Sequence, residues 1–229
     1  MLGKDGLTHP RVYVALLDCP DELPAQALLD TLTDECRARA HGFLSAKRRH
    51  DYLWGRVLLT ALTEHVAPWA RLVERPPLAP FIKSDIPLYA SVSHTRGAVA
   101  VSLATVPASV DVEIMTASRV RQALFERVFL PELWSVAEQG NSVDYFYRAW
   151  GVYECAVKLP GVFRQSIEEG FWIEVPDGAR RACVKHAVIA GSVMLTLAAS
   201  RAFEEHVFAA VPDEGGLTLT ASDTVLAAG

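Results

Sequence analysis

The chain has 229 residues and a formal net charge of −5, with 51% hydrophobic and 21% charged residues. These proportions are ordinary for a folded globular protein and exclude a disordered chain. The mild negative charge argues against a general nucleic-acid surface, although a local basic patch could still bind a small phosphorylated ligand.

Cysteine use and hydropathy bear on the cellular compartment. The four cysteines, at positions 19, 36, 155 and 183, show no CxxC or other metal-binding spacing, so we expect reduced thiols and a cytoplasmic protein. No segment is long and apolar enough to be expected to span a bilayer. The N-terminus has no signal-peptide pattern, and we expect no membrane partner.

The first part of the chain predicts one strand followed by helices. Residues 11–18 are rich in Val and Leu and read as a strand that ends before Pro20. A helical pattern runs from residue 22 to about 44, and Ser45 is the expected N-cap of a longer helix over 46–66. Four prolines within residues 71–87 exclude a regular helix and predict an extended connection.

Strands and helices then alternate to the end of the chain. Strands are expected over 88–93, 98–103 and 110–114, the first two forming a hairpin through the turn His94-Thr-Arg-Gly97. Helical patterns cover 118–138 and 143–159, and Pro160-Gly161 ends the second. Four strand-like segments follow, over 171–175, 183–189, 192–199 and 206–211.

Both halves of the chain run from a long helix to a β-hairpin. We therefore expect an α+β fold of two similar α+β lobes with a cleft between them, over residues 1–114 and 115–212, followed by a loose tail over 213–229. One continuous α+β domain is the alternative. A chain that builds its own cleft needs no second subunit, so we expect a monomer.

The sequence VDVEI at positions 110–114 places two carboxylates on one side of a predicted strand. Side chains alternate between the faces of a strand, so Asp111 and Glu113 project together while the apolar residues pack inward. Mg²⁺ prefers one or two protein carboxylates completed by water and phosphate oxygens. The alternative is a strand whose exposed face happens to be acidic.

The helix from Tyr145 to Lys158 carries charge inside an apolar pattern. Glu154 and Lys158 are four residues apart and share one face, as does Trp150 one turn earlier. Such pairs usually decorate a solvated surface. Because little of this helix is polar, we expect the charged residues to face a cleft, with Trp150 serving to pack the helix.

Two more segments offer groups suited to phosphate. In Ser-Val-Ser-His-Thr, at positions 91–95, Ser93 supplies a hydroxyl donor and His94 an imidazole that can be protonated. The alternative is that His94 only closes a turn. On the helix over 46–66, Arg48 and Arg56 lie two turns apart and line one stripe suited to a phosphate monoester.

Other basic residues are weaker candidates. Arg75 adds a cation before the proline-rich stretch, and Arg37 and Arg39 rank below it. The alternative for the whole basic run is a solvated helix face. No Walker loop, GxGxxG, HExxH or GxSxG motif occurs, which disfavours the usual nucleoside triphosphatases, nicotinamide dehydrogenases, zincins and serine hydrolases.

Taken in order, these segments resemble the motifs of the Sfp-type 4′-phosphopantetheinyl transferases. The resemblance lies in KRRHDYLWGR, ERPPL, SVSHT, SVDVE and WGVYECAVK, and it runs from about Lys47 to Gly161. It implies two similar α+β halves with coenzyme A and Mg²⁺ bound between them. It also implies transfer of the 4′-phosphopantetheine group to a serine of an apo acyl or peptidyl carrier protein, with release of adenosine 3′,5′-bisphosphate.

The resemblance also assigns roles by matching motif positions. The residues that would hold the metal are Asp111, Glu113 and Glu154. The residues that would contact coenzyme A phosphates are Ser93, His94, Lys158, Arg75, and, for the 3′-phosphate, Arg48 and Arg56. Glu154 is the expected general base for the attacking serine, and Lys158 would neutralise or protonate the leaving oxygen.

The sequence departs from the family pattern at four positions. Ser91 replaces Asn, Thr95 replaces Ser, Ser109 replaces Gly, and Tyr153 replaces the Lys before the catalytic Glu. Ser109 indicates that no positive φ is needed there. These changes keep two alternatives open: a non-catalytic relative that binds coenzyme A or a carrier, and an unrelated Mg²⁺-dependent phosphohydrolase. Gly151 inside a helix predicts close approach by another segment.

Overall fold

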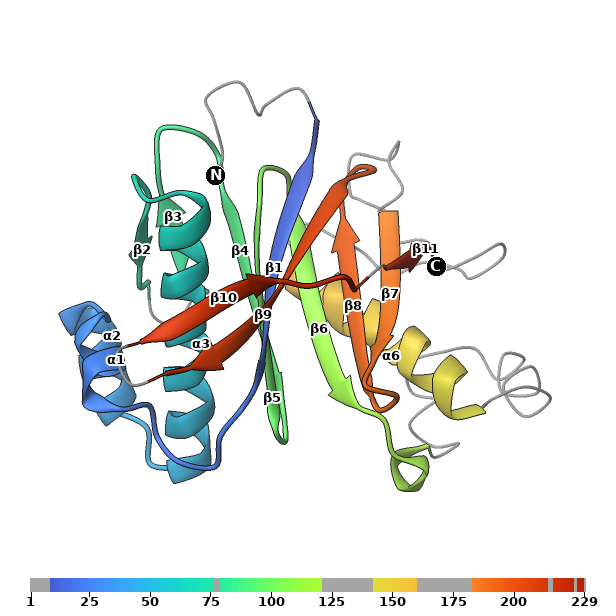
Figure 1. Ribbon diagram of the computed structural model, residues 1–229, viewed down its shortest axis with the longest axis horizontal. Helices are drawn as coiled ribbons and strands as arrows, with labels where there is room; N and C mark the ends of the chain where they lie inside the picture. The colour runs from blue at the N-terminus through green and yellow to red at the C-terminus, as the bar shows by residue number, and fades with distance from the viewer. Residues whose placement is uncertain are drawn as a thin grey trace.

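The computed structural model describes residues 9–75, 79–120, 142–159, 183–213, 216–224 and 226–228. The fold is α+β, as the sequence predicts, with helices packed against β-sheets (Figure 1). Within the described ranges, no helix has both the length and the apolar character needed to cross a membrane. Most of the expected helix over 118–138, from residue 121 on, and the expected strand over 171–175 lie outside the described residues; the described start of that helix, at 118–119, is part of a 3₁₀ turn.

The first sheet has the strand order β10-β9-β1-β5-β4. Its members are β1 (Arg11–Asp18), β4 (Tyr89–Thr95), β5 (Ala98–Ala104), β9 (Glu204–Pro212) and β10 (Leu217–Ala221). The predicted β4–β5 hairpin is confirmed, and Gly97 takes the positive φ of 82° that its turn requires. The prediction placed His94 and Thr95 in that turn, whereas β4 extends through both.

The second sheet has the order β11-β7-β8-β6, and all its pairs are antiparallel. Its members are β6 (Ala108–Ile114), β7 (Cys183–Ile189), β8 (Val193–Ala199) and β11 (Ala227–Ala228). A third, two-stranded sheet pairs β2 (Arg71–Val73) with β3 (Phe81–Lys83). The expected extended connection over 71–87 therefore contains a small hairpin, with the prolines lying outside its strands.

The helices begin and end at recognisable caps. The segment expected as one helix from residue 22 to 44 is two, α1 (Gln26–Asp30) and α2 (Asp34–His41), because Thr33 caps α2 by accepting a 3.3 Å bond from the Cys36 amide. Helix α3 (Ala46–Val66) has its predicted N-cap, since Ser45 Oγ accepts from the Arg48 amide. Helix α6 (Ser142–Lys158) follows the short 3₁₀ helix η1 (Ala117–Arg119).

The elements form four layers, α3 and α6 lying outside two sheets that pack face to face (Figure 1). One core joins α3 to the inner residues of β1 and β5, including Leu17, Leu58 and Val101. A second core lies between the sheets, and smaller clusters join α6 to β8. At the open side, β4 and β6, the edge strands of the two sheets, lie next to each other.

Each sheet contains one strand that comes from the other half of the chain. Strand β6, from the first half of the chain, belongs to the second sheet, while β9 from the second half pairs in parallel with β1. The tail expected to be loose after Asp213 instead supplies β10, paired with β9, and β11, paired with β7. The alternation Leu-Thr-Leu-Thr explains β10, because Leu217 and Leu219 pack against the first core.

Candidate functional site

A pocket of about 580 Å³ opens beside the β4 edge of the first sheet. Helix α3 supplies one wall, β4 another, and the C-terminal end of α6 a third. Its lining includes Arg48, Tyr52, Arg56, Ser91, His94 and Lys158. Residues from three motifs far apart in the sequence therefore face one space.

Lys158 connects three segments at the wall of this pocket. Its Nζ donates to Ser93 Oγ at 2.9 Å, to Asp111 Oδ1 at 2.8 Å and to the Val110 carbonyl oxygen at 3.1 Å. Ser93 Oγ also donates to Asp111 Oδ1, at 2.8 Å. Because Asp111 is only 4% exposed, this network supplies the charge and the hydrogen bonds that a buried carboxylate needs.

Glu113 has partners on three elements. Its carboxylate accepts from Arg119 Nη1 at 2.6 Å, from Thr95 Oγ1 at 3.2 Å and from Trp150 Nε1 at 3.0 Å. Burial raises the pKa of Glu113 and the nearby Asp111 adds to the rise, while Arg119 opposes it. Trp150, expected only to pack, thus also orients a carboxylate, because a partly buried indole N–H requires an acceptor.

Glu154 differs from the other two carboxylates because it makes no hydrogen bond or ion pair within the described part of the chain. It is half-buried, and burial raises its pKa; Asp111 and Glu113 add to the rise, and Lys158 opposes it. Lys158, four residues later on the same helix, pairs with Asp111 instead. Glu154 is therefore a carboxylate with free oxygens and a raised pKa beside two other acids, which suits proton transfer.

The three expected metal ligands, Asp111, Glu113 and Glu154, are not arranged as a complete metal site. Among the residues that the structure describes, no three His, Cys, Asp or Glu side chains are close enough to hold a metal ion. The donor chemistry does fit Mg²⁺, since all three are carboxylates, and Asp111 raises the pKa of both glutamates. A bound cation would relieve that repulsion. The ligand assignment to Asp111, Glu113 and Glu154 stays a prediction.

His94 lies on the pocket wall with a buried acid behind it. Its Nδ1 is 3.6 Å from Asp51 Oδ2, and about half of its side chain is exposed. Partial burial lowers the pKa of His94, Lys47 and Lys158 act in the same direction, and Asp51 and Asp111 oppose them. His94 is thus placed to meet an anion in the pocket.

The two arginines expected at the 3′-phosphate differ in their surroundings. Arg48 is exposed, and its guanidinium has no ion-pair partner in the described ranges. Arg56 is 6% exposed, pairs through Nε with Glu74, and stacks 4.5 Å from the centre of the Tyr52 ring. Arg39 pairs with the same Glu74 at 2.6 Å. Arg48 is free for a ligand, whereas Arg56 is already held by a carboxylate that is only 1% exposed.

Arg75 is not in the pocket wall. It is exposed, and its guanidinium lies 4.2 Å from the centre of the Phe81 ring. The structure therefore does not bring Arg75 together with the other predicted phosphate contacts. Arg37, the other low-ranked cation, is held at the start of α2 by Asp34 and by two backbone carbonyls.

Three sequence features near the site find physical explanations. Ser109 lies inside β6 without positive φ, as predicted, and its Oγ donates to the Cys155 carbonyl at 2.9 Å, which ties β6 to α6. Ser91 Oγ accepts from the Val110 amide at 3.3 Å and so links the two sheet edges. The predicted close approach at Gly151 is confirmed, because a Cβ there would lie 2.2 Å from Thr196 Oγ1.

Sequence reasoning gave no contact role to four side chains that shape the site. Asp51, Glu74, Thr95 and Arg119 each hold a predicted residue in place, but only one carries a usable signal. Asp51 follows Lys47 by four residues on one helix, a spacing that predicts contact. The other three come from separate elements, so no local pattern could have joined them to their partners.

Comparison with known proteins does not place the chain in a family: no family model matches it, and no curated protein matches its sequence. Its function must therefore be argued from the site and from the motifs.

Proposed function

We propose that this protein is a 4′-phosphopantetheinyl transferase, which moves the 4′-phosphopantetheine group from coenzyme A to a serine of an apo acyl or peptidyl carrier protein. Adenosine 3′,5′-bisphosphate is the other product. The proposal takes in the Sfp-type resemblance, a Mg²⁺ requirement and the carrier partner together.

The observation that carries the proposal is the contact of Lys158 with Ser93 and Asp111. These residues belong to three of the resembling motifs and are separated by 65 and 47 positions from Lys158. A chance resemblance in short motifs gives no reason for them to converge. Here Ser93 and Asp111 meet behind Lys158, which also lines the pocket that Arg48 and His94 face.

The order of elements also supports two related halves. Helix α3 is followed by the β4–β5 hairpin and by β6, which joins the second sheet. Helix α6 is likewise followed by the β7–β8 hairpin and by β9, which joins the first sheet. Each helix thus packs on the hairpin that follows it, and the strand after that hairpin joins the other sheet.

The chain's own residues divide the work of binding. Arg48 and His94 face the pocket and would contact phosphate oxygens of coenzyme A. Ser93 does not line this pocket and donates its hydroxyl proton to Asp111, so it could contact phosphate only after giving up that bond. Lys158 lines the same pocket, and its three N–H groups already donate to Ser93, Val110 and Asp111, so a bound phosphate would take the place of one of these acceptors. Asp111, Glu113 and Glu154 would hold Mg²⁺, which when bound stabilises negative charge on the pyrophosphate oxygens.

Proton transfer falls to Glu154. The carrier serine must lose its proton as its oxygen bonds to the phosphorus that bears the pantetheine arm. Asp111 and Glu113 already accept hydrogen bonds, whereas Glu154 accepts none within the described residues, so its oxygens are the ones open to take the proton. The bond from that phosphorus to the bridging oxygen breaks, and the Lys158 ammonium neutralises the charge left on the bisphosphate.

Incubation with coenzyme A, Mg²⁺ and a panel of apo carrier proteins tests the proposal. Each modified carrier should gain the mass of one phosphopantetheine group, and Glu154→Gln protein should modify the carrier far more slowly than wild type. No transfer to any carrier, with coenzyme A still bound, would instead support a non-catalytic relative. One observation favours this second candidate. Two of the expected metal ligands already have ion-pair partners, Asp111 with Lys158 and Glu113 with Arg119.

The third possibility gives a different product pattern. A Mg²⁺-dependent phosphohydrolase using the same acids would release bisphosphate from coenzyme A with water alone. Release of bisphosphate without a carrier, at a rate that added carrier does not change, would replace the transferase assignment.

A further inference from the structure

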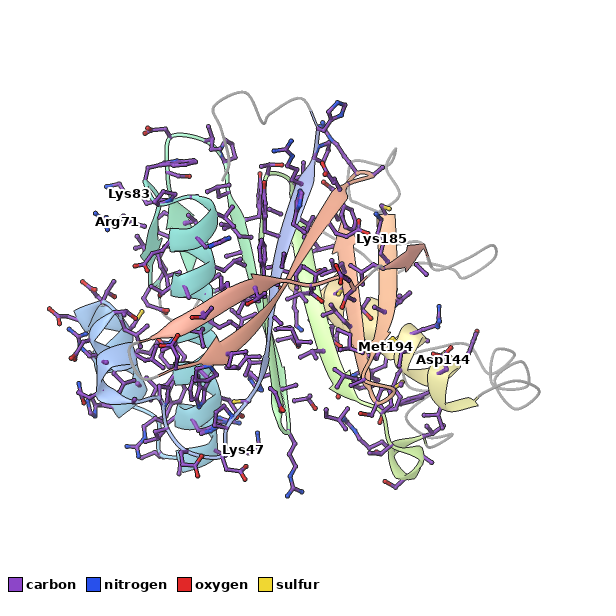
Figure 2. The ribbon with its side chains drawn as sticks, viewed as in Figure 1. Lys47, Arg71, Lys83, Asp144, Lys185 and Met194 are labelled. Atoms are coloured by element: carbon purple, nitrogen blue, oxygen red, sulfur yellow. The ribbon has the colours of Figure 1, made fainter. Side chains whose placement is uncertain are left out.

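Asp51 lies between two pockets, next to His94. It lines the pocket described above and also a second one of about 570 Å³, on the other side of the α3 N-terminal turn. Figure 2 shows Lys47, its neighbour one turn earlier, at this end of α3. Asp51 is 8% exposed, so its charge must be compensated by the protein.

Three basic side chains surround this one carboxylate. Lys47 Nζ donates to Asp51 Oδ2, His50 Nδ1 lies 3.3 Å from Oδ1, and His94 Nδ1 lies 3.6 Å from Oδ2. Hydrogen bonds from Lys47 and His50 outweigh the effect of burial and leave the pKa of Asp51 lowered. Asp51 is therefore ionised and shared among its neighbours.

His50 differs from His94 because both of its ring nitrogens have partners within the protein. Its second ring nitrogen, Nε2, lies 2.8 Å from the Pro20 carbonyl oxygen. The two ring nitrogens of His50 thus each face an oxygen, one on Asp51 and one on Pro20, and His50 lines the second pocket rather than the first. Asp51 thus has Lys47 as its cationic partner and His50 as a second neighbour, and its Oδ2 also faces Nδ1 of His94.

We propose that Asp51 is a positioning residue for His94: its carboxylate faces Nδ1 at 3.6 Å, favours the ring orientation that leaves Nε2 for the ligand, and couples phosphate binding to protonation of His94. This inference rests on the proposed function, because it takes coenzyme A as the ligand. In the free protein the ring is neutral, with its proton on Nδ1 toward Asp51. When the phosphate arrives, Nε2 takes one proton from solvent and donates it in a hydrogen bond to a phosphate oxygen.

The charges that face His94 favour this sequence of events. Lys47 and Lys158 disfavour a cationic ring in the empty pocket, while Asp51 and Asp111 favour it. A phosphate monoester adds up to two negative charges, which shifts the balance toward the imidazolium. Asp51 is the acid in direct ion-pair distance, so its removal should weaken the coupling most.

The first experiment needs no ligand. Histidine resonances are titrated by NMR in wild-type protein, in Asp51→Asn, and in Asp21→Asn as a matched control that removes an exposed carboxylate from the second pocket. The midpoint of the His94 titration should shift to lower pH in Asp51→Asn and stay in place in Asp21→Asn. An unchanged midpoint in folded Asp51→Asn overturns the inference.

The second experiment uses coenzyme A and also covers the case in which Asp51→Asn does not fold. Binding is measured by calorimetry in two buffers of different ionisation enthalpy, with wild-type protein and His94→Gln. Wild type should take up protons, and His94→Gln should lose that uptake; comparing the two removes the contribution of the ligand's own 3′-phosphate. Equal proton uptake in both proteins overturns the inference and leaves the proposed function standing. If wild type binds no coenzyme A, the proposed function fails, while the ligand-free titration still decides the Asp51–His94 coupling.

Discussion

Lys158 Nζ lies 2.8 Å from Asp111 Oδ1, at the point where α6 meets the edges of both sheets. The side chain of Asp111 is 5% exposed and that of Lys158 24%, so the pair is largely withdrawn from water. Removing one partner of such a pair leaves a charge that the protein cannot solvate. This contact is therefore structural as well as part of the proposed site.

Lys158→Met should reduce the free energy of unfolding by about 3 kcal/mol, because it leaves Asp111 buried and unpaired. Asp111→Asn combined with Lys158→Met should cost less than the sum of the single changes. Urea denaturation of the four proteins in this cycle measures the coupling. Arg148→Met is the control: its partner Asp144 is 31% exposed, and the loss should stay below about 1 kcal/mol. Additive effects at Asp111 and Lys158 would show that the pair is not coupled.

Glu154→Gln should separate catalysis from stability. Without a hydrogen-bonded partner in the described structure, the side chain can lose its charge with no cost in the free energy of unfolding at pH 7. Removal of the base should lower the rate of transfer by about 10²–10⁴-fold. The rate comes from the carrier mass-shift assay and the stability from urea denaturation. Near-normal turnover in a folded variant would remove Glu154 from the mechanism.

Arg48 and Arg56 should give different results when each is changed to Ala. Arg48→Ala should raise the KM for coenzyme A about tenfold or more, with a much smaller effect on dephospho-coenzyme A and no loss of stability. Arg56→Ala should also destabilise the protein by about 2–3 kcal/mol, since it removes one of the two cations that pair with buried Glu74. Equal KM changes for both substrates in Arg48→Ala would reject the 3′-phosphate contact.

The sequence predicted the local elements of the site well because they depend on nearby residues. Helix α3 begins after Ser45 as expected, and β6 presents Asp111 and Glu113 on one side through simple alternation. The family resemblance named the residues that gather at Lys158. What the pattern could not supply was pairing between different elements of the fold. Glu74 and Arg119 each satisfy a charge on another element, so their role depends on the tertiary fold.

The same limit explains the errors in the fold. Composition after Asp213 is rich in small residues and predicted a loose tail, but β9 offers a free edge that the Leu-Thr alternation of β10 can pair with. The exchange of β6 and β9 between sheets is also invisible locally, because each strand has the same pattern whichever neighbour it joins. Residue pattern determined the strands, and packing determined their partners.

Gly151→Ala should be strongly destabilising for a residue change of one methyl group. The added Cβ would lie 2.2 Å from Thr196 Oγ1 and 2.8 Å from Thr196 Cβ, so α6 or β8 must shift. The expected loss is about 2–3 kcal/mol. Gly42→Ala is the control, because its Cβ would meet only the Arg39 carbonyl oxygen at 3.4 Å. Urea denaturation of both variants checks this, and a mild effect at Gly151 would mean that the helix and sheet separate easily.

The dependence of stability on pH should show two opposite trends. The pKa values of Glu113 and Glu154 are raised above 4.5, so these groups hold their protons to higher pH in the folded protein than in the unfolded chain. Their contribution to the free energy of unfolding therefore falls as pH rises from about 4.5 through the folded pKa values, and is constant above them. Asp51 and Glu74 have lowered pKa values, so the stability they provide is present above their unfolded values of 3.8 and 4.5 and is lost as pH falls through the folded values.

Variants distinguish these contributions. Glu154→Gln should flatten the decline on the side above pH 4.5, and Glu74→Gln should weaken the loss on the acid side, both measured as urea midpoints across pH. Glu35→Gln, at an exposed position on α2, should reproduce the wild-type profile. Added Mg²⁺ at neutral pH should raise the midpoint of wild type more than that of Glu154→Gln, because a cation would compensate the crowded carboxylates. Equal stabilisation of both proteins by Mg²⁺ would show that Glu154 is not a ligand.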